Sequence, residues 1–130
     1  MKQYKGKMNF GYEKIKTAEL EYFPYEYSGE NILFFTETDE FSCVCPWSSL
    51  PDFANLEIEY IPNKRCVELK SLKIYVVSFR DVGIFHEHAV NRIFNDLWKL
   101  LEPQYLQVIM KYKNRGGFIT TSQKCRGIKI

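Results

Sequence analysis

The chain has 130 residues, a mass of 15.5 kDa and a hydrophobic content of 45%, a profile that predicts one globular domain and excludes a disordered protein. Its formal net charge of +2 gives no large positive surface, which argues against direct binding to nucleic acid. Because no apolar run approaches the roughly 20 residues of a membrane helix, and the N-terminus lacks the apolar segment of a secretory signal, we expect a soluble cytoplasmic protein with no membrane partner.

The first half of the chain predicts an N-terminal arm followed by two strands. Residues 1–28 combine charged helix formers with aromatic side chains, and we expect them to form an arm or a leading strand of a single domain, residues 1–130. Residues 31–38 are rich in apolar and aromatic side chains, as strands are. Prolines interrupt residues 41–52, which predicts a loop, whereas residues 55–60 alternate polar and apolar side chains and predict a half-buried strand.

Two helices are expected in the middle of the chain. From residue 68 to residue 79, apolar side chains recur at helical spacing, although the β-branched run at 74–77 leaves a strand open. The segment Asp81-Val-Gly83 breaks this pattern. A second and stronger apolar stripe, from Val90 to Leu101, predicts a longer helix that ends before Pro103.

Two further strands complete the predicted fold. Residues 106–112 alternate again, residues 114–117 predict a hairpin turn, and the last strand begins near Phe118. The order strand, strand, helix, helix, strand, strand predicts an α+β fold in which two helices pack on one antiparallel sheet. Such a sheet has exposed edges, which natural proteins rarely leave unpaired, so we expect the chain to form a homo-oligomer.

The chain has four cysteines and no secretory signal, so we expect the thiols to stay reduced. They are Cys43, Cys45, Cys66 and Cys125. His86 and His88 could supply further ligands, but the C-x-C spacing lacks the paired ligands of structural zinc sites. We therefore expect no bound metal, and the thiols remain candidates for catalysis or for simple burial.

Cys45 is the strongest candidate for a nucleophile. It lies next to Pro46 in a predicted loop, and Asp52 follows seven residues later, beyond a second proline. A thiol becomes nucleophilic when a neighbouring group accepts its proton, and the prolines restrict the loop in a way that can return the carboxylate to the sulfur. Two alternatives stay open: Cys43 is the reactive thiol, or Cys45 is a packed side chain without a role in chemistry.

His86 and Glu87 form a second candidate group at the start of the second predicted helix. Histidine moves protons near neutral pH, and a buried glutamate can accept two hydrogen bonds from the N–H edge of a guanine-like ring. The simpler interpretation is that the charge of Glu87 stabilises the N-terminus of this helix.

Basic residues on the first predicted helix and in the last turn are candidates for phosphate binding. Lys70 and Lys73 are three residues apart and are neighbours on a helix surface, so they can hold a phosphate between them. Arg115 precedes two glycines whose backbone N–H groups can also bind phosphate. Their ordinary roles, as solvated lysines and as part of a turn, remain open. No Gly-rich nucleotide-binding motif is present.

Three ordered motifs resemble the NADPH-dependent 7-cyano-7-deazaguanine reductases, the nitrile reductases of the queuosine pathway. The most specific is Glu68-Leu-Lys-Ser-Leu-Lys-Ile-Tyr75, which is similar to a hallmark motif of that family. The other two are Cys45-Pro with Pro51-Asp-Phe-Ala54, and Ser78-Phe-Arg with Phe85-His-Glu87 and Asn95-Asp-Leu97. The resemblance covers about residues 31–117, with departures at Ser49-Leu50, Ile74 and Asn114.

The resemblance implies a tunnelling fold and a covalent mechanism. Cys45 would attack the nitrile carbon of the bound deazaguanine to form a thioimide, and Asp52 would shuttle the proton. Two NADPH would deliver the two hydrides that convert the nitrile to the primary amine of 7-aminomethyl-7-deazaguanine. His86 would assist proton delivery, and Glu87 would bind the pyrimidine edge of the base.

The resemblance also implies the remaining binding residues and the assembly. The substrate-binding set is Val67, Glu68, Leu69, His86 and Glu87. The NADPH-binding set is Lys70, Ser71, Lys73, Tyr75 and Arg115. Single-domain members of the family form homodecamers of two face-to-face pentamers with sites between subunits, and the resemblance implies the same assembly for this chain.

Three other functions remain as alternatives. An amidinotransferase related to this family acts on the nitrile already installed in tRNA, but those relatives lack the NADPH motif at residues 68–75. A zinc-dependent relative of the GTP cyclohydrolase kind would need metal ligands from the cysteines, His86 or His88. A non-catalytic purine- or pterin-binding module would use Cys45 only for packing.

Overall fold

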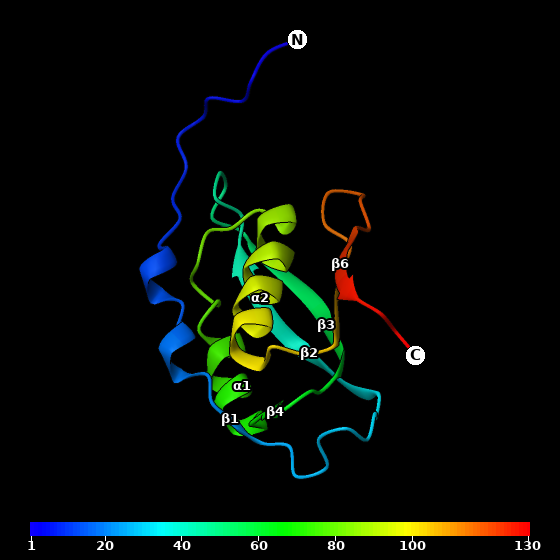
Figure 1. Ribbon diagram of the computed structural model, residues 1–130. Helices are drawn as coiled ribbons and strands as arrows, with labels where there is room; N and C mark the ends of the chain where they lie inside the picture. The colour runs from blue at the N-terminus through cyan, green and yellow to red at the C-terminus, as the bar shows by residue number, and fades with distance from the viewer.

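The computed structural model describes residues 1–130 and has two layers, a four-stranded antiparallel sheet and two helices on one of its faces (Figure 1). The strands, in the spatial order β2-β3-β5-β6, are β2 (Phe34–Val44), β3 (Pro51–Ile61), β5 (Tyr105–Tyr112) and β6 (Thr121–Gly127). The helices are α1 (Leu69–Val77) and α2 (His86–Leu101), and neither is long and apolar enough to cross a membrane. The predicted α+β class and element order are confirmed.

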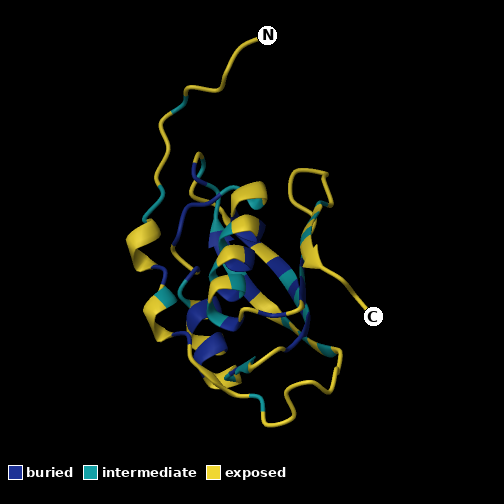
Figure 2. Cartoon of the chain, viewed as in Figure 1, coloured by how far each residue is buried: buried dark blue, intermediate teal, exposed yellow.

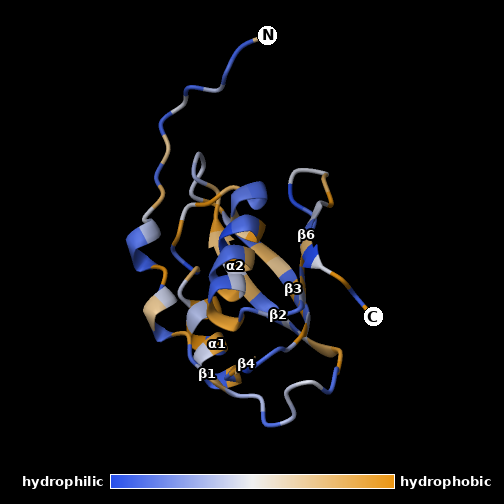
Figure 3. Cartoon of the chain, viewed as in Figure 1, coloured by the Kyte–Doolittle hydropathy of each residue, from blue (hydrophilic) through white to orange (hydrophobic).

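The core lies between the helices and the sheet, because alternate residues of each central strand face the helices. On β3, Leu56, Ile58 and Tyr60 are buried, whereas Glu57 and Glu59 lie on the opposite face. The apolar stripe of α2 covers the buried face, as its helical spacing predicts. Figure 2 shows the buried residues concentrated between these layers, and Figure 3 shows that the same region is the most hydrophobic.

The predicted loop at residues 41–52 is wrong at both ends, because the strands extend into it. β2 continues to Val44 and β3 begins at Pro51, so the loop covers only residues 45–50. A register shift between Thr38 and Phe41 bends β2 and allows the strands to stay paired. Pro51 is tolerated because it is the first residue of its strand, where its missing N–H group interrupts the hydrogen-bond ladder least.

The arm docks through elements that are too short to predict. Two 3₁₀ turns, η1 (Tyr12–Lys14) and η2 (Thr17–Glu19), lead into β1 (Tyr22–Pro24). This strand pairs with β4 (Arg65–Val67) in a separate two-stranded sheet. Strands of three residues show no periodic pattern, so the sequence predicts no more than an arm or a leading strand.

The ambiguous run at residues 74–77 is helical. Tyr75 and Val76 are buried against the core, while Ile74 and Val77 stay exposed on the outer side of α1. Burial of one helix face outweighs the preference of β-branched residues for strands, because tertiary packing supplies most of the stability of a short helix.

Candidate active site

Four candidate residues meet at one end of the sheet, the upper end in Figure 1. Cys45 lies in the loop between β2 and β3, and Asp52 is the second residue of β3. His86 is the first residue of α2, and Arg115 lies in the turn between β5 and β6. Three connections that are far apart in the sequence therefore build one cluster.

Asp52 is the centre of this cluster and is only 5% exposed. Its Oδ1 accepts a hydrogen bond from Arg115 Nε at 2.5 Å, and its Oδ2 accepts one from His86 Nε2 at 3.2 Å. A buried carboxylate is costly unless it is paired, and here a guanidinium and an imidazole bind its two oxygens. These two partners hold the carboxylate in one orientation.

His86 is fixed through both ring nitrogens and through one face of its ring. Its Nδ1 lies 3.1 Å from Thr120 Oγ1, and its ring stacks on Tyr112 with the centroids 3.6 Å apart. Because Nε2 faces the Asp52 carboxylate, the neutral ring carries its proton on Nε2 and accepts a hydrogen bond at Nδ1 from the Thr120 hydroxyl. The imidazole can exchange a proton with Asp52 without changing its orientation.

The Cys45 thiol is accessible, and its pKa lies below the ordinary value of a thiol. Partial burial by itself raises this pKa. Hydrogen bonds from the Ser48 hydroxyl and from the N–H groups of Ser48 and Trp47, with the nearby Arg115 guanidinium, stabilise the thiolate and outweigh burial. Cys45 thus combines access with an environment that favours the nucleophilic form.

Cys43, the alternative nucleophile, has the opposite environment. It is completely buried, and its Sγ lies 4.0 Å from the carbonyl oxygen of Ile84. Burial, together with the nearby Asp52 carboxylate, raises the pKa of the Cys43 thiol to about 12. Such a thiol stays protonated at neutral pH and packs in the core, so the geometry favours Cys45 as the nucleophile.

Sequence reasoning missed three residues of this cluster. Ser48, Tyr112 and Thr120 reach Cys45 or His86 only through turn geometry and strand register. Serine, tyrosine and threonine have many ordinary roles, so their types alone give no signal. Glu87 is exposed in the first turn of α2, next to this network in the sequence.

The remaining substrate-binding candidates lie elsewhere on the chain. Val67 is buried, Glu68 caps α1, and Leu69 is exposed. The Glu68 carboxylate accepts two hydrogen bonds at 2.8 Å from N–H groups in the first turn of α1, and these bonds lower its pKa. Figure 1 shows β4 and the start of α1 at the end of the sheet opposite to the Cys45 loop.

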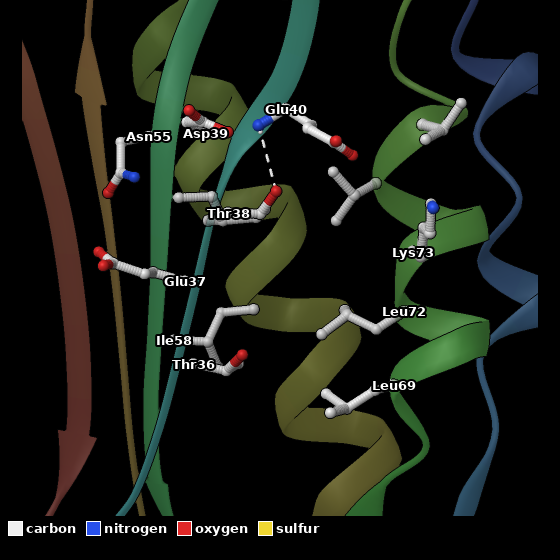
Figure 4. Close-up of a pocket in the computed structure, with 13 residues that line it drawn as sticks. Thr36, Glu37, Thr38, Asp39, Glu40, Asn55, Ile58, Leu69, Leu72 and Lys73 are labelled. Atoms are coloured by element: carbon white, nitrogen blue, oxygen red, sulfur yellow. Dashed lines mark hydrogen bonds between the residues drawn. The ribbon is translucent and has the colours of Figure 1, made fainter.

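A hollow of about 530 Å³ separates β2 from α1 (Figure 4). Thr36 and Thr38 of β2 line one side, and the other side includes Leu69, Leu72 and Lys73 of α1. Acidic side chains of the β2 bulge lie at the Lys73 end of the hollow. The hollow thus contains two of the candidate residues but none of the cluster around Asp52.

The two groups of candidates lie apart in one copy of the chain. Leu69 lines the same hollow as Ile58, and Ile58 lies six residues along β3 from Asp52. Six residues of a strand span roughly 20 Å. In one copy of the chain, the residues around Leu69 and the cluster around Asp52 therefore lie in different places.

The lysines of the candidate cofactor set are accessible. Lys70 and Lys73 are exposed on α1 and belong to none of the ion pairs of the chain. Their positive charges suit the phosphate groups of a dinucleotide, so these two residues fit NADPH. Arg115 lies apart from them, with Asp52 and Cys45.

Ser71 and Tyr75 of the same set are buried and bonded internally. The Ser71 hydroxyl accepts a hydrogen bond from the N–H group of Glu21 at 2.9 Å. The Tyr75 hydroxyl donates to Asp96 Oδ2 at 2.6 Å, and burial together with this carboxylate raises the Tyr75 pKa. Within one chain these two side chains fix the arm and α1 in place, and contact with a cofactor stays a prediction for them.

All four cysteines are unpaired, and no three histidine, cysteine or carboxylate side chains come together in a group that could hold a metal ion. The zinc-dependent alternative needs such a group. Its candidate ligands Cys45 and His86 instead interact with Arg115 and Asp52, respectively.

A solved structure shares this architecture. The apo crystal structure of the archaeosine synthase QueF-Like matches with a TM-score of 0.66 and 23% sequence identity, and the match covers 77% of this chain and 96% of the other. This likeness shows the fold. The fold and the cluster around Asp52 define a tunnelling-fold protein with an accessible thiol of lowered pKa.

Sequence comparisons identify the family of the chain. The model of the QueF-like protein family matches residues 51–128. The NADPH-dependent 7-cyano-7-deazaguanine reductases of Caldicellulosiruptor bescii and Caldanaerobacter subterraneus subsp. tengcongensis are 57% and 52% identical over 111 residues, covering 85% of this chain and 85% and 83% of those proteins. The chain belongs to the family of NADPH-dependent 7-cyano-7-deazaguanine reductases, and the resemblance found in its motifs is confirmed.

Proposed function

We propose that the chain reduces the nitrile of 7-cyano-7-deazaguanine to the primary amine of 7-aminomethyl-7-deazaguanine, with NADPH as the reductant, in the biosynthesis of queuosine in tRNA. The observation that carries this proposal is the accessible Cys45 thiol of lowered pKa beside Arg115, which also pairs with the Asp52 carboxylate. Relatives at 57% and 52% identity are named for this activity.

The first step is the addition of Cys45 to the substrate. The sulfur attacks the nitrile carbon, a C–S bond forms, and one π bond of the nitrile breaks to give a thioimide. The proton lost by the thiol passes through Asp52 to the nitrile nitrogen. Arg115 and Ser48 lower the cost of the thiolate before the attack, and His86 holds Asp52 in the orientation for transfer.

Conversion of the thioimide to an amine needs two hydrides and further protons. Bound NADPH supplies one hydride in each of two reductions. After the first reduction the sulfur leaves as the Cys45 thiolate, which the same hydrogen bonds stabilise, and the carbon–nitrogen double bond remains for the second. His86 and Asp52 are the proton donors within reach of the Cys45 loop.

The nitrile substrate and NADPH bind to residues that lie apart from one another in a single chain. Glu87, on the exposed first turn of α2, binds the pyrimidine edge of the base next to His86. Val67, Glu68 and Leu69 of a neighbouring subunit complete the substrate pocket. Lys70 and Lys73 bind the phosphates of NADPH, and Ser71 and Tyr75 support the helix that carries these lysines. Arg115 approaches the cofactor from the Cys45 side.

The assembly that satisfies this geometry is a homodecamer of two face-to-face pentamers with sites between subunits. Its support is the separation of Asp52 from Leu69, together with the open edges of β2 and β6, which are the outer strands of the sheet. We place the enzyme in the cytoplasm, where a reducing environment keeps the four thiols free.

The test is formation of the covalent adduct. Incubation of the protein with 7-cyano-7-deazaguanine without NADPH should add the mass of the nitrile substrate, and Cys45→Ala should abolish the addition. Cys43→Ala is the matched control and should retain it, because Cys43 is buried. An adduct that survives Cys45→Ala would contradict the assignment. An adduct without any NADPH oxidation would favour the amidinotransferase, and binding without either would favour the non-catalytic module.

A further inference from the structure

A second hollow, of about 490 Å³, lies where the arm meets the C-terminal end of α1. Four basic side chains line it, two from the arm, one from α1 and one from the turn after α1, and they are Lys14, Lys16, Lys73 and Arg80. The only acidic residue in its lining is Asp81. We call this site the basic hollow, and its lining carries an excess of positive charge.

The basic side chains of the basic hollow form no ion pair within the chain. None of the six ion pairs includes Lys14, Lys16, Lys73 or Arg80. Arg80 alone would fit the common preference for cations at a helix C-terminus. The arm lysines are different, because they come from another segment, and like charges repel unless an anion lies between them. The hollow is therefore suited to a group with high negative charge, such as a phosphate.

The arm lysines are held in place at this hollow. The N–H group of Lys16 donates a hydrogen bond to Ser78 Oγ at 3.0 Å. The neighbouring Ile15 is buried in the core, and Thr17 donates to Asp96 Oδ2 at 3.1 Å. The backbone that carries Lys14 and Lys16 is thus docked on the domain, so part of the entropy cost of gathering these charges is met by folding.

The position of the basic hollow relates it to the proposed cofactor path. Lys73 lines the basic hollow and also the hollow between β2 and α1, which contains Leu69. The nine residues of α1 span about 13 Å. If Lys70 and Lys73 held the diphosphate of NADPH with its nicotinamide on the Glu68 side, the adenosine end would lie toward the C-terminal end of α1.

We propose that the basic hollow binds the 2′-phosphate of NADPH, through Lys14, Lys16 and Arg80, and thereby sets the preference for NADPH over NADH. This inference rests on the proposed function. The two cofactors differ only in that phosphate, which carries close to two negative charges at neutral pH. Lysine and arginine are the side chains that bind such a group, and a nearby arginine is a common partner of the 2′-phosphate in other folds.

The test compares the two cofactors in the double variant Lys16→Gln/Arg80→Gln. The kcat/KM for NADPH should fall by about tenfold or more, whereas the kcat/KM for NADH should change little, because charge-assisted contacts to phosphate are lost only for NADPH. Lys99→Gln, which removes an exposed lysine of α2 far from the hollow in the sequence, should leave both values unchanged. The charge-preserving Lys16→Arg/Arg80→Lys variant should retain the preference.

A binding measurement gives an independent readout. Calorimetric titration of the unreacted protein should show tighter binding of NADP⁺ than of NAD⁺, and the double variant should lose this difference. A double variant that folds and keeps the wild-type preference in both measurements would overturn the inference. A wild-type protein that oxidises no NADPH in the presence of the nitrile would instead contradict the proposed function, so the two failures are distinguishable.

Discussion

At the scale of single residues, the arrangement around Asp52 assigns different roles to two cysteines that are two positions apart. Cys45 has hydrogen-bond donors around its sulfur, while Cys43 faces the core. The motif around Cys45 and Asp52 could be predicted from the sequence because the loop is short and both residue types are chemically distinctive. Thr120 and Tyr112 could not, since their contacts with His86 depend on how β5 continues into the last turn.

The lowered pKa of Cys45 predicts how adduct formation depends on pH. The rate should rise as the thiol ionises and level off at a pH below that expected for a free cysteine. Arg115→Gln removes a cation that stabilises the thiolate, so the pKa rises and the midpoint of the profile should move to higher pH. Stopped-flow measurement of adduct formation between pH 5 and pH 10 checks this.

Lys113→Gln is the control for that experiment, because Lys113 is an exposed cation near the same turn and is not one of the groups that lower the Cys45 pKa. Its profile should match the wild type. An Arg115→Gln profile with an unchanged midpoint would mean that the arginine does not act on the thiol.

At the scale of elements, periodicity predicted α2 and the centre of β3 well, the ends of β2 and β3 poorly, and the three-residue strands not at all. The stripe of α2 and the alternation of β3 each bury one face, which leaves a repeated pattern. β1 and β4 are set by contacts distant in the sequence, and the start of β3 at Pro51 depends on pairing with Val44. The arm could be expected to pack, but its docking through Ser71 could not be read from local sequence.

The hydrogen bond between the Glu21 N–H group and the Ser71 hydroxyl should make a measurable contribution to the stability of the docked arm. Ser71→Ala removes the hydrogen bond that the N–H group of Glu21 donates to the Ser71 hydroxyl, which should lower the free energy of unfolding by about 0.5–1.5 kcal/mol. Chemical denaturation measures this change, and hydrogen exchange should show faster exchange of the Glu21 amide.

Ser122 offers a matched control, because its buried hydroxyl has no hydrogen-bond partner in the chain. Ser122→Ala should change the free energy of unfolding by less than about 0.5 kcal/mol. Equal losses for the two variants would show that the hydrogen bond between Ser71 and the arm does not hold the arm in place.

At the scale of the whole molecule, the fold places two sets of candidate residues at opposite ends of one sheet. Asp52 lies roughly 20 Å along β3 from Ile58, which lines the hollow beside α1 together with Leu69. Sequence motifs list such residues without saying which copy supplies them. The path of the strands separates the motif at residues 68–75 from the Cys45 loop within one chain, and this separation supports the proposed site between subunits.

Mixing two inactive variants tests whether Cys45 and Glu68 of one site come from different subunits. Cys45→Ala and Glu68→Gln homo-oligomers should each have little activity. Oligomers refolded from an equal mixture should recover about one quarter of the wild-type activity, because about one site in four combines two intact halves in a symmetric ring. Activity is measured after separation of the mixed assembly by size. No recovery, in assemblies shown to be mixed by mass, would place both residues in the same subunit's site.

In the proposed mechanism, the chain carries out a four-electron reduction of a nitrile through Cys45. The most direct measurement is the absorbance of NADPH over time with a known, limiting amount of 7-cyano-7-deazaguanine, beside a Cys45→Ala control. We predict that two NADPH are oxidised per nitrile consumed, because each supplies one hydride, and that the control oxidises none. Nitrile consumption without NADPH oxidation would contradict the reduction, and equal oxidation by the control would contradict the role of Cys45.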